Sequence, residues 1–266
     1  MDWWWAYLAL GAFAGFFSGL LGVGGGSAMV PILTLIFASK QLAPDHVVHL
    51  ALGTAMATIL FTSASSVISH HRRGAVNWRI LRDMIPGVLA GTFGGAMLAS
   101  YFNALLLGIL FAVVVFFSAT QLLLDLKPKA TRALPGTTGM WVAGGIIGAL
   151  ASLAALAGAS LTVPFLVSRN VPVHRAIGTA AAVGWPLAFA GTAGYVLSGL
   201  TVPDLPNHSV GFVYLPAVLW IVIASVIMAP LGASVAHRTP GATLKRIFAI
   251  VLYALATKMV WSLLHR

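Results

Sequence analysis

Charged side chains are too scarce in this chain to cover the surface of a water-soluble globule. The 266 residues include 15 Lys and Arg and 5 acidic residues, or 8% in all, whereas a soluble domain carries about 25%. The charges stand in short clusters between long apolar stretches, and the mean hydropathy is +0.97. This pattern predicts an all-α polytopic membrane protein. It excludes an ordinary soluble domain, a disordered chain and a nucleic-acid partner, because the net charge of +10 belongs to the loops.

Eight apolar regions are candidates for membrane-embedded helices. A helix needs about 20 apolar residues to cross a bilayer, and six regions fit one crossing each. These six are 47–69, 84–101, 104–124, 176–198, 210–236 and 244–264. The other two, 3–37 and 140–167, do not fit a simple crossing because glycines interrupt them.

The two interrupted regions are predicted to form broken helices. The sequence Gly-Gly-Gly-Ser interrupts region 3–37 and Gly-Ala-Ser interrupts region 140–167, and a proline follows each, Pro31 or Pro164. Glycine loosens a helix and proline removes a backbone donor. Helices broken at membrane depth persist only where they are buried in protein or line a cavity. We therefore expect each region to form a hairpin of two helical pieces.

The interrupted regions belong to an internal repeat. Three collinear blocks of the first half recur in the second, at offsets of 133, 125 and 137 residues. The matched pairs are Gly11/Gly144, Gly15/Gly148, Gly25/Gly158, Ser27/Ser160, Val30/Val163 and Pro31/Pro164, then His49/His174, Gly53/Gly178, Thr54/Thr179, Ala55/Ala180 and Ala57/Ala182, then Gly95/Gly232, Ala96/Ala233, Phe111/Phe248 and Ala112/Ala249. One integral membrane domain, 1–266, thus divides into repeat 1 (1–125), a cytoplasmic linker (126–138) and repeat 2 (139–266).

The distribution of Lys and Arg indicates that the repeats have opposite orientations. The loop near 70–83 holds four arginines and its counterpart 199–209 holds no Lys or Arg, whereas residues 102–103 are uncharged and their counterpart 237–246 holds three. Cytoplasmic loops carry the excess of Lys and Arg. We therefore expect two inverted-topology repeats, each a re-entrant hairpin followed by three spanning helices. The protein would lie in a bacterial-type cytoplasmic (inner) membrane, with both termini outside the cytoplasm. The alternative, eight plain spans with the N-terminus inside, places a basic loop outside.

These motifs resemble those of a known transporter family. The pattern is Gly15-x3-Gly19-x2-Gly22-x-Gly24-Gly25-Gly26-x4-Pro31, followed by Gly53-Thr54-Ala55, with weaker copies of both in the second half. It is similar to the TauE/SafE sulfite-exporter family, also called the 4-toluenesulfonate uptake permease family. The likeness covers nearly the whole chain. It implies transport of small anions, mainly sulfite, sulfonates and related organosulfur acids, by import or export.

The second copy of the motif departs from the family pattern. Where the family often repeats the Gly-Gly-Gly run, this chain has Ala-Gly-Ala at 157–159, and Ser152 and Ala155 replace two further glycines. The added methyl groups narrow access to the backbone. We therefore expect a site in the second half to be smaller or less polar.

Two helix breaks near the midplane suit a negatively charged ligand. N–H groups at a helix start point at the cavity, the helix dipole favours negative charge there, and glycine lets a ligand approach the backbone. The predicted substrate-binding residues are Gly24, Gly25, Gly26, Ser27, Thr54, Gly158, Ala159, Ser160 and Thr179. The alternative is that small residues only permit close helix packing, which we prefer for the ladders Gly11–Gly15–Gly19 and Gly87–Gly91–Gly95.

Two histidines and an arginine are further candidates for contact with an anion or a proton. His49 and His174 each precede a matched Gly-Thr pair by four residues, and Arg175 follows His174. A histidine at such a place can carry a proton. The alternative is a structural residue at a helix start and, for Arg175, a charge that orients the loop.

Missing residue types exclude several classes of protein. Without cysteine there is no disulfide, thiolate metal site or iron–sulfur cluster, and no Walker A motif is present for ATP hydrolysis. The five Asp residues lie at region ends or in loops, so carboxylate ion sites in the membrane are not expected. We expect no cofactor and no metal. The expected partners are a small anionic substrate, membrane lipid and, as the glycine ladders permit, a second copy of the chain.

The sequence favours a secondary transporter (permease) that moves small sulfur-containing anions by alternating access around the two breaks. It leaves open an anion channel and a transporter of another small anionic metabolite. An intramembrane serine hydrolase is less favoured. It would need one placed base for Ser27, whereas this serine recurs in both halves beside matched histidines.

Overall fold

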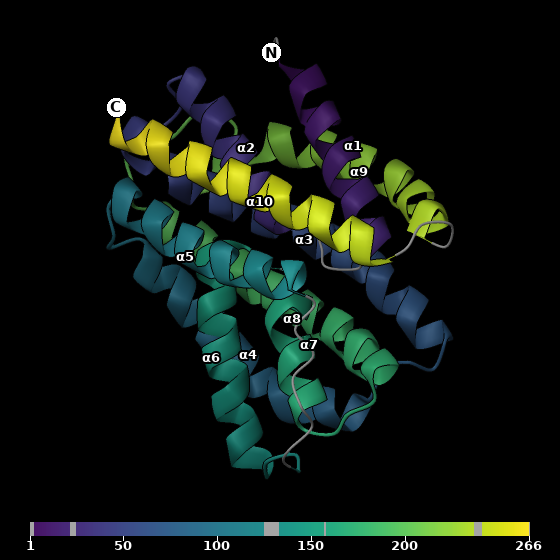
Figure 1. Ribbon diagram of the computed structural model, residues 1–266. Helices are drawn as coiled ribbons and strands as arrows, with labels where there is room; N and C mark the ends of the chain where they lie inside the picture. Colours follow the sequence, from purple (N-terminus) through teal and green to yellow (C-terminus); the bar gives the residue numbers. More distant parts are fainter. Residues whose placement is uncertain (1–2, 22–24, 125–132, 157, 237–240, 266) are drawn as a thin grey trace.

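The described part of the chain is almost entirely α-helical (Figure 1). The computed structural model describes residues 3–21, 25–124, 133–156, 158–236 and 241–265. The first half contains α1 (Trp4–Leu21), α2 (Gly26–Ser39), the 3-10 helix η1 (Pro44–His46), α3 (Val47–Arg72), α4 (Trp78–Ala99) and α5 (Ala104–Leu123). The second half contains α6 (Thr137–Ala154), α7 (Ala159–Ser168), α8 (Val173–Gly199), β1 (Ser209–Val210), β2 (Val213–Tyr214), α9 (Leu215–Ala236) and α10 (Gly241–Leu264).

Six helices of the described residues are long and apolar enough to cross a membrane, as an all-α polytopic membrane protein requires. They lie in α3, α5, α6, α8, α9 and α10. α4 is not among them, although the sequence predicts a crossing at 84–101, because Arg79, Arg82 and Asp83 lower the hydropathy of its first turns. α6 is among them, although the sequence assigns its residues to a broken region.

The helix breaks fall at the predicted glycine interruptions, between α1 and α2 and between α6 and α7. At the second break, Ala155 and Gly158 have φ angles of 43° and 44°. Positive φ ends a right-handed helix and turns the chain, and it costs glycine far less than alanine.

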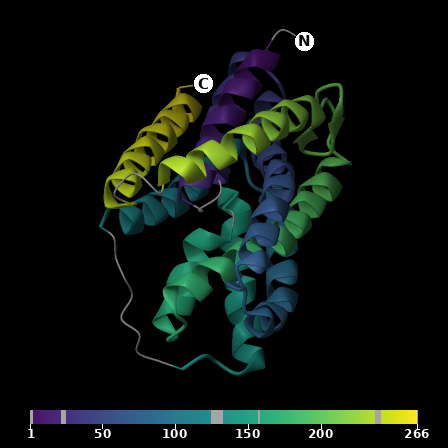
Figure 2. The ribbon, with the colours of Figure 1, turned by 90° about the vertical axis from the view of Figure 1, so that its right-hand side faces the viewer.

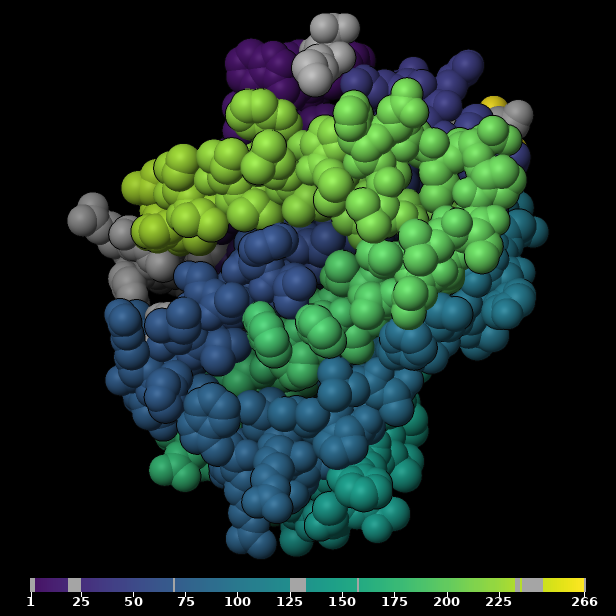
Figure 3. Space-filling model, turned by 180° about the vertical axis from the view of Figure 1, so that it is seen from behind, coloured from purple at the N-terminus to yellow at the C-terminus, as the bar shows by residue number. Residues whose placement is uncertain are grey.

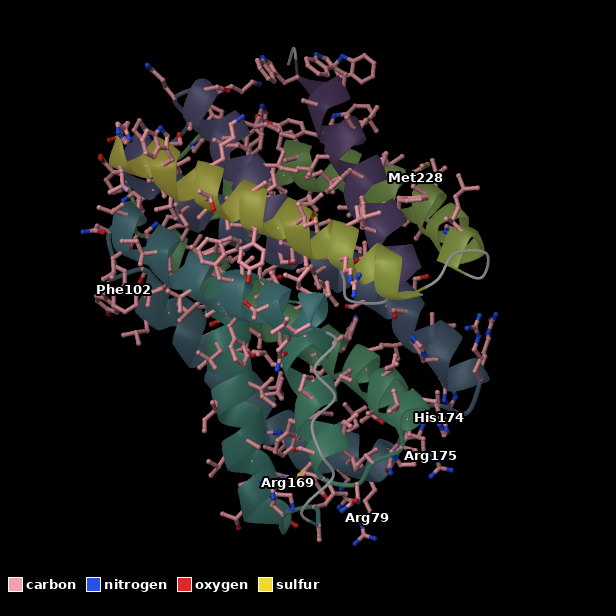
Figure 4. The ribbon with its side chains drawn as sticks, viewed as in Figure 1. Arg79, Phe102, Arg169, His174, Arg175 and Met228 are labelled. Atoms are coloured by element: carbon pink, nitrogen blue, oxygen red, sulfur yellow. The ribbon has the colours of Figure 1, made fainter. Side chains whose placement is uncertain are left out.

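Each broken region folds back on itself. Lys40, just beyond α2, lies 5.6 Å from the ring centre of Trp3, just before α1. The rings of Tyr7 and Phe37 are 6.5 Å apart. The N-terminus lies at the upper end of Figure 1, whereas α6 begins at the lower end, where Arg169 after α7 also lies in the same view (Figure 4). The two hairpins therefore open toward opposite ends of the molecule.

Each hairpin packs mainly against the other half of the chain. α1 packs along α9 and α6 packs along α4 (Figures 1 and 2). The glycine ladders make these approaches possible. A Cβ on Gly11 would lie 2.5 Å from the carbonyl oxygen of Ile221, and a Cβ on Gly91 would lie 2.0 Å from that of Gly145. The ladders therefore serve close helix packing, as predicted.

α3 and α8 form the centre of the molecule. They pack against each other and are the most buried of the six candidate spans. α5 packs against α10 on the outside (Figure 1), and these two helices and α9 are the least buried of the six candidate spans. The β-hairpin of β1 and β2 leads into α9 and packs against α3. Large apolar side chains that remain exposed on the outer helices suit contact with lipid.

Candidate functional site

The two helix breaks meet inside the molecule. A Cβ on Gly26, the first residue of α2, would lie 2.2 Å from the carbonyl oxygen of Ala155 and 2.4 Å from Cδ1 of Ile59. Only glycine permits this approach. Gly25, Gly26 and Ala155 are all buried, so the first break, the second break and α3 come together at one interior place.

Backbone donors at this place differ in whether they are already paired. By helix geometry, the first N–H groups of α2 and of α7 have no acceptor in their own helix. They belong to Gly26 and Ser27 in α2 and to Ala159 and Ser160 in α7. The N–H of Gly158 instead donates to the carbonyl of Leu156 at 2.9 Å. Gly158 therefore shapes the turn and does not offer its N–H to a ligand.

At the end of α6, the carbonyl of Ala151 accepts two hydrogen bonds, whereas the first N–H groups of α7 have no acceptor in their own helix. Leu156 donates to the carbonyl of Ala151 at 3.0 Å, and the N–H of Ala155 shares that acceptor. No Asp lies in the described residues of α1, α2, α6 or α7. Among the described residues no side chain caps the first N–H groups of α2 or α7, and such groups attract an anion.

Thr54 and Thr179 each hold a loop of the other half. The hydroxyl oxygen of Thr54 accepts the backbone N–H of Tyr214 at 3.0 Å, and that of Thr179 accepts the backbone N–H of Asn77 at 2.9 Å. Both threonines are fully buried. These oxygens therefore take part in a structural hydrogen bond, in addition to the substrate contact that the sequence predicts for them.

The preceding glycines receive the same loops. A Cβ on Gly53 would lie 2.2 Å from the carbonyl oxygen of Phe212, and a Cβ on Gly178 would lie 2.5 Å from that of Ala75. We call the contact of Gly53–Thr54 with 212–214 the first joint. We call the contact of Gly178–Thr179 with 75–77 the second joint. The Gly-Thr motif therefore has a packing role that the sequence alone did not reveal.

The matched histidines have different surroundings. His49 is buried, its Nε2 lies 2.9 Å from the carbonyl oxygen of Ala99, and its ring stacks on Phe212. His174 and Arg175 are exposed and lie at the same end of the molecule as Arg79 and Arg169 (Figure 4). The structure does not bring these three candidates to the breaks.

Sequence reasoning missed two polar groups near the second break. Thr162, in the first turn of α7, is fully buried, and its hydroxyl has no hydrogen-bond partner among the described residues. Tyr195 of α8 is fully buried and donates to the carbonyl of Ser152 at 3.0 Å. Thr162 gives no signal in the repeat because Met29 occupies the matching position. Gly24, also predicted for the site, lies outside the described residues.

A polytopic helical protein whose two broken helices meet at a buried place has the architecture of a membrane transporter. Comparison with known families agrees with that class. The chain belongs to the sulfite exporter TauE/SafE family, whose model matches residues 7–259.

Relatives in three organisms bear the name of probable membrane transporter proteins. A probable membrane transporter protein of Haemophilus influenzae is 34% identical over 95% of this chain and 96% of its own length. The probable membrane transporter protein YdhB of Bacillus subtilis is 33% identical over 70% of this chain and 76% of its own. A probable membrane transporter protein of Methanocaldococcus jannaschii is 22% identical over 92% and 91%. No solved structure matches the chain.

The comparisons decide the broad class. Both the family and the named relatives are transporters, so the expectation of a membrane transporter rather than an enzyme is confirmed. The relatives' names specify no substrate.

Proposed function

We propose that the protein is a secondary transporter of small sulfur-containing anions, such as sulfite or organosulfonates, with the substrate held between the two helix breaks. The observation that carries this proposal is the approach of Gly26 to Ala155, which brings the start of α2 against the end of α6, so that the two breaks meet at one buried place. The first N–H groups of α2 and of α7, which no described side chain caps, favour an anion. The description of the family, sulfite exporter, supports a sulfur oxyanion as the substrate class.

Paired contacts support an arrangement of the halves as inverted repeats. Gly11 approaches the carbonyl of Ile221, and Gly144 approaches that of Met84 at 2.7 Å. The two glycines differ by 133 positions and the two partners by 137, which are offsets of the sequence repeat. The two joints are related by the same repeat, because their N–H donors, Tyr214 and Asn77, also differ by 137 positions.

The positions of the joints support alternating access. The first joint lies beside the end of α8, since a Cβ on Gly53 would be 3.1 Å from Cβ of Tyr195. Thr179 of the second joint precedes Tyr195 by 16 positions in α8, or about 24 Å along a helix. One joint therefore closes each end of the α3–α8 pair. Opening either joint alone would expose the breaks to one side of the membrane.

Basic residues support an orientation in the cytoplasmic membrane. Arg79, Arg169 and Arg175 lie at one end of the molecule (Figure 4), and the N-terminus lies at the other (Figure 1). Positive charge marks the cytoplasmic side. We place the arginine end in the cytoplasm and both termini outside it.

Counterflow into proteoliposomes tests the function. Vesicles loaded with unlabelled sulfite should take up external labelled sulfite, with saturation and with competition by sulfonates. Failure of the folded protein to move any sulfur anion would remove the substrate class. Flux that grows linearly with voltage, without saturation or counterflow, would indicate a channel.

A pair of serines in α2 tests the site. Ser27 lies buried at the break, whereas Ser39 at the other end of α2 is exposed and bonds the carbonyl of Ile36. Ser27→Ala should raise the half-saturation concentration roughly fivefold, the effect of one lost hydrogen bond of about 1 kcal/mol. Ser39→Ala is the matched control and should leave transport unchanged. Equal effects of the two variants would remove the site from the first break.

A further inference from the structure

A large apolar pocket is lined by residues that do not belong to the helix breaks. Its volume is about 1280 Å³, and residues of α1, α3, α8, α9 and the β-hairpin line it. Leu60, Val196, Val218 and Val222 form part of its wall. Pockets for drug-sized ligands measure roughly 300–1,000 Å³. A small oxyanion would leave most of this space unfilled.

One end of the pocket is polar and positively charged. Lys40 lines the pocket there, with its Nζ 5.6 Å from the ring centre of Trp3 and 5.9 Å from that of Tyr7. Tyr7 is 3% exposed, and its hydroxyl has no hydrogen-bond partner among the described residues. No Asp or Glu is among the lining residues. A cation beside an unpaired buried donor suits a phosphate or another oxygen-rich anionic group.

The remaining wall of the pocket is apolar, and part of it is exposed on the outside of the protein. Phe61 of α3 and Leu219 of α9, both on candidate spans, line the pocket and are 55% and 57% exposed. Figure 3 shows the side of the molecule where α9 (lime) lies above α3 (blue) and α8 (green). Exposed apolar side chains on membrane-crossing helices suit contact with lipid, so this wall would open the pocket toward the bilayer. Trp3, Trp4 and Trp220 are among its lining residues and suit the interface between the bilayer and water.

We propose that this pocket binds an anionic phospholipid, with the phosphate at Lys40 and the hydroxyl of Tyr7 and an acyl chain against the apolar wall between α3 and α9. The charge at one end matches the headgroup, and the apolar wall open to the bilayer matches the chain. The site is distinct from the helix breaks and does not depend on the transported substrate.

Native mass spectrometry of the purified, delipidated full chain tests the headgroup contact. The probes are phosphatidylglycerol and phosphatidylcholine with identical acyl chains. Wild-type protein should retain phosphatidylglycerol at least fivefold more strongly, and Lys40→Gln should abolish the difference. Lys258→Gln is the matched control, because Lys258 is exposed on α10 and is not a lining residue; it should behave as wild type. Equal retention of both lipids by wild type, or an equal loss in Lys258→Gln, would overturn the proposal.

A second pair of variants tests the acyl-chain contact. Val222→Trp narrows the pocket at a half-buried position, whereas Val226→Trp adds the same ring one turn further along α9, at an exposed position outside the lining. Val222→Trp should lose phosphatidylglycerol and Val226→Trp should retain it. Sulfite added at saturating concentration should not displace the lipid. Retention by Val222→Trp, or displacement by sulfite, would contradict the assignment of the pocket to a lipid.

Discussion

At the first helix break Gly26 packs against the opposing half of the chain, whereas at the second break Gly158 packs against the helix that follows it. Gly26 approaches Ala155 across the molecule, but Gly158 lies at a φ of 44° against the carbonyl of Ala180 in α8. The joints do not differ in this way. In both, a buried threonine accepts a loop N–H, at 3.0 Å in the first joint and 2.9 Å in the second.

The contrast between the breaks and the joints indicates which parts of the two repeats can differ in sequence. Each joint packs a glycine against a backbone carbonyl of the other half, so a change in either partner should weaken that contact. The breaks meet a ligand in our proposal, so each can acquire its own polar groups. Buried Ser27 then serves the first break, and Thr162 serves the second. The two joints should therefore respond alike to mutation and the two breaks should respond differently.

The largest effect should come from adding a methyl group at a joint. Gly53→Ala and Gly178→Ala both place a Cβ within 2.5 Å of a loop carbonyl oxygen. Overpacking of this kind costs about 1–3 kcal/mol, and backbone neighbours relax little. Both variants should lower the thermal midpoint measured by size-exclusion chromatography in detergent. Gly94→Ala, on the exposed side of α4 with nothing within 4 Å, should not.

Removing the hydrogen bond of a joint should destabilise the protein less than adding a methyl group there. The effect of each variant should be confined to one end of the molecule. Thr54→Val and Thr179→Val each remove the hydrogen bond to a part-buried backbone N–H, at about 1 kcal/mol. Each should loosen only its own end of the α3–α8 pair. Because the chain has no cysteine, single cysteines at the matched positions Ala57 and Ala182 can report labelling near each joint.

The reporters separate a directional effect from a general one. Thr54→Val should raise labelling at Ala57→Cys and Thr179→Val at Ala182→Cys. Thr58→Val and Thr192→Val are the controls, since these hydroxyls bond carbonyls one turn back in their own helices. If each joint variant raised both reporters equally, the joints would be general supports and would not gate access.

A smaller effect is expected from the unpaired hydroxyl at the second break. Thr162→Val should raise the half-saturation concentration for sulfite roughly fivefold, the equivalent of one hydrogen bond of about 1 kcal/mol. Thr34→Val is the control, because Thr34 is also buried, with a hydroxyl that has no partner in the described part of the chain, but lies about 12 Å along α2 from Gly26. Identical kinetics in the two variants would remove Thr162 from the site.

The smallest expected effect is a difference in stability between variants of the two matched histidines. His49→Leu removes a buried hydrogen bond to Ala99 and should cost about 1 kcal/mol of stability. His174→Leu changes an exposed residue and should alter stability by less than about 0.5 kcal/mol. Thermal unfolding in detergent measures both. A large loss in His174→Leu would show that this residue has a role the structure does not reveal.

The sequence was informative where side-chain identity reports backbone geometry. The glycine interruptions at 22–27 and 158–160 predicted both helix breaks, because only glycine and small residues permit those turns and approaches. The apolar runs predicted most of the helices. α4 was the exception, since its charged first turns lie in a helix that the apolar pattern placed only at 84–101.

The contacts between the halves could not be predicted in the same way. Asn77 and Tyr214 act through their backbone N–H groups, so their side chains differ and the repeat does not reveal them. For the same reason the threonines were interpreted as ligands although their oxygens accept loop N–H groups. Thr162 escaped notice because its counterpart is Met29, and a single buried hydroxyl leaves no pattern in the sequence.

The packing of α1 along α9 also determines when the protein can finish folding during synthesis. The ribosome completes α1 at Leu21 but does not reach the start of α9 at Leu215 until much later, roughly 10–40 s at typical elongation rates. Throughout that interval the glycine ladder of α1 has no partner, and the first hairpin waits in the membrane. Biogenesis of this chain therefore depends on protection of an early segment until late ones emerge.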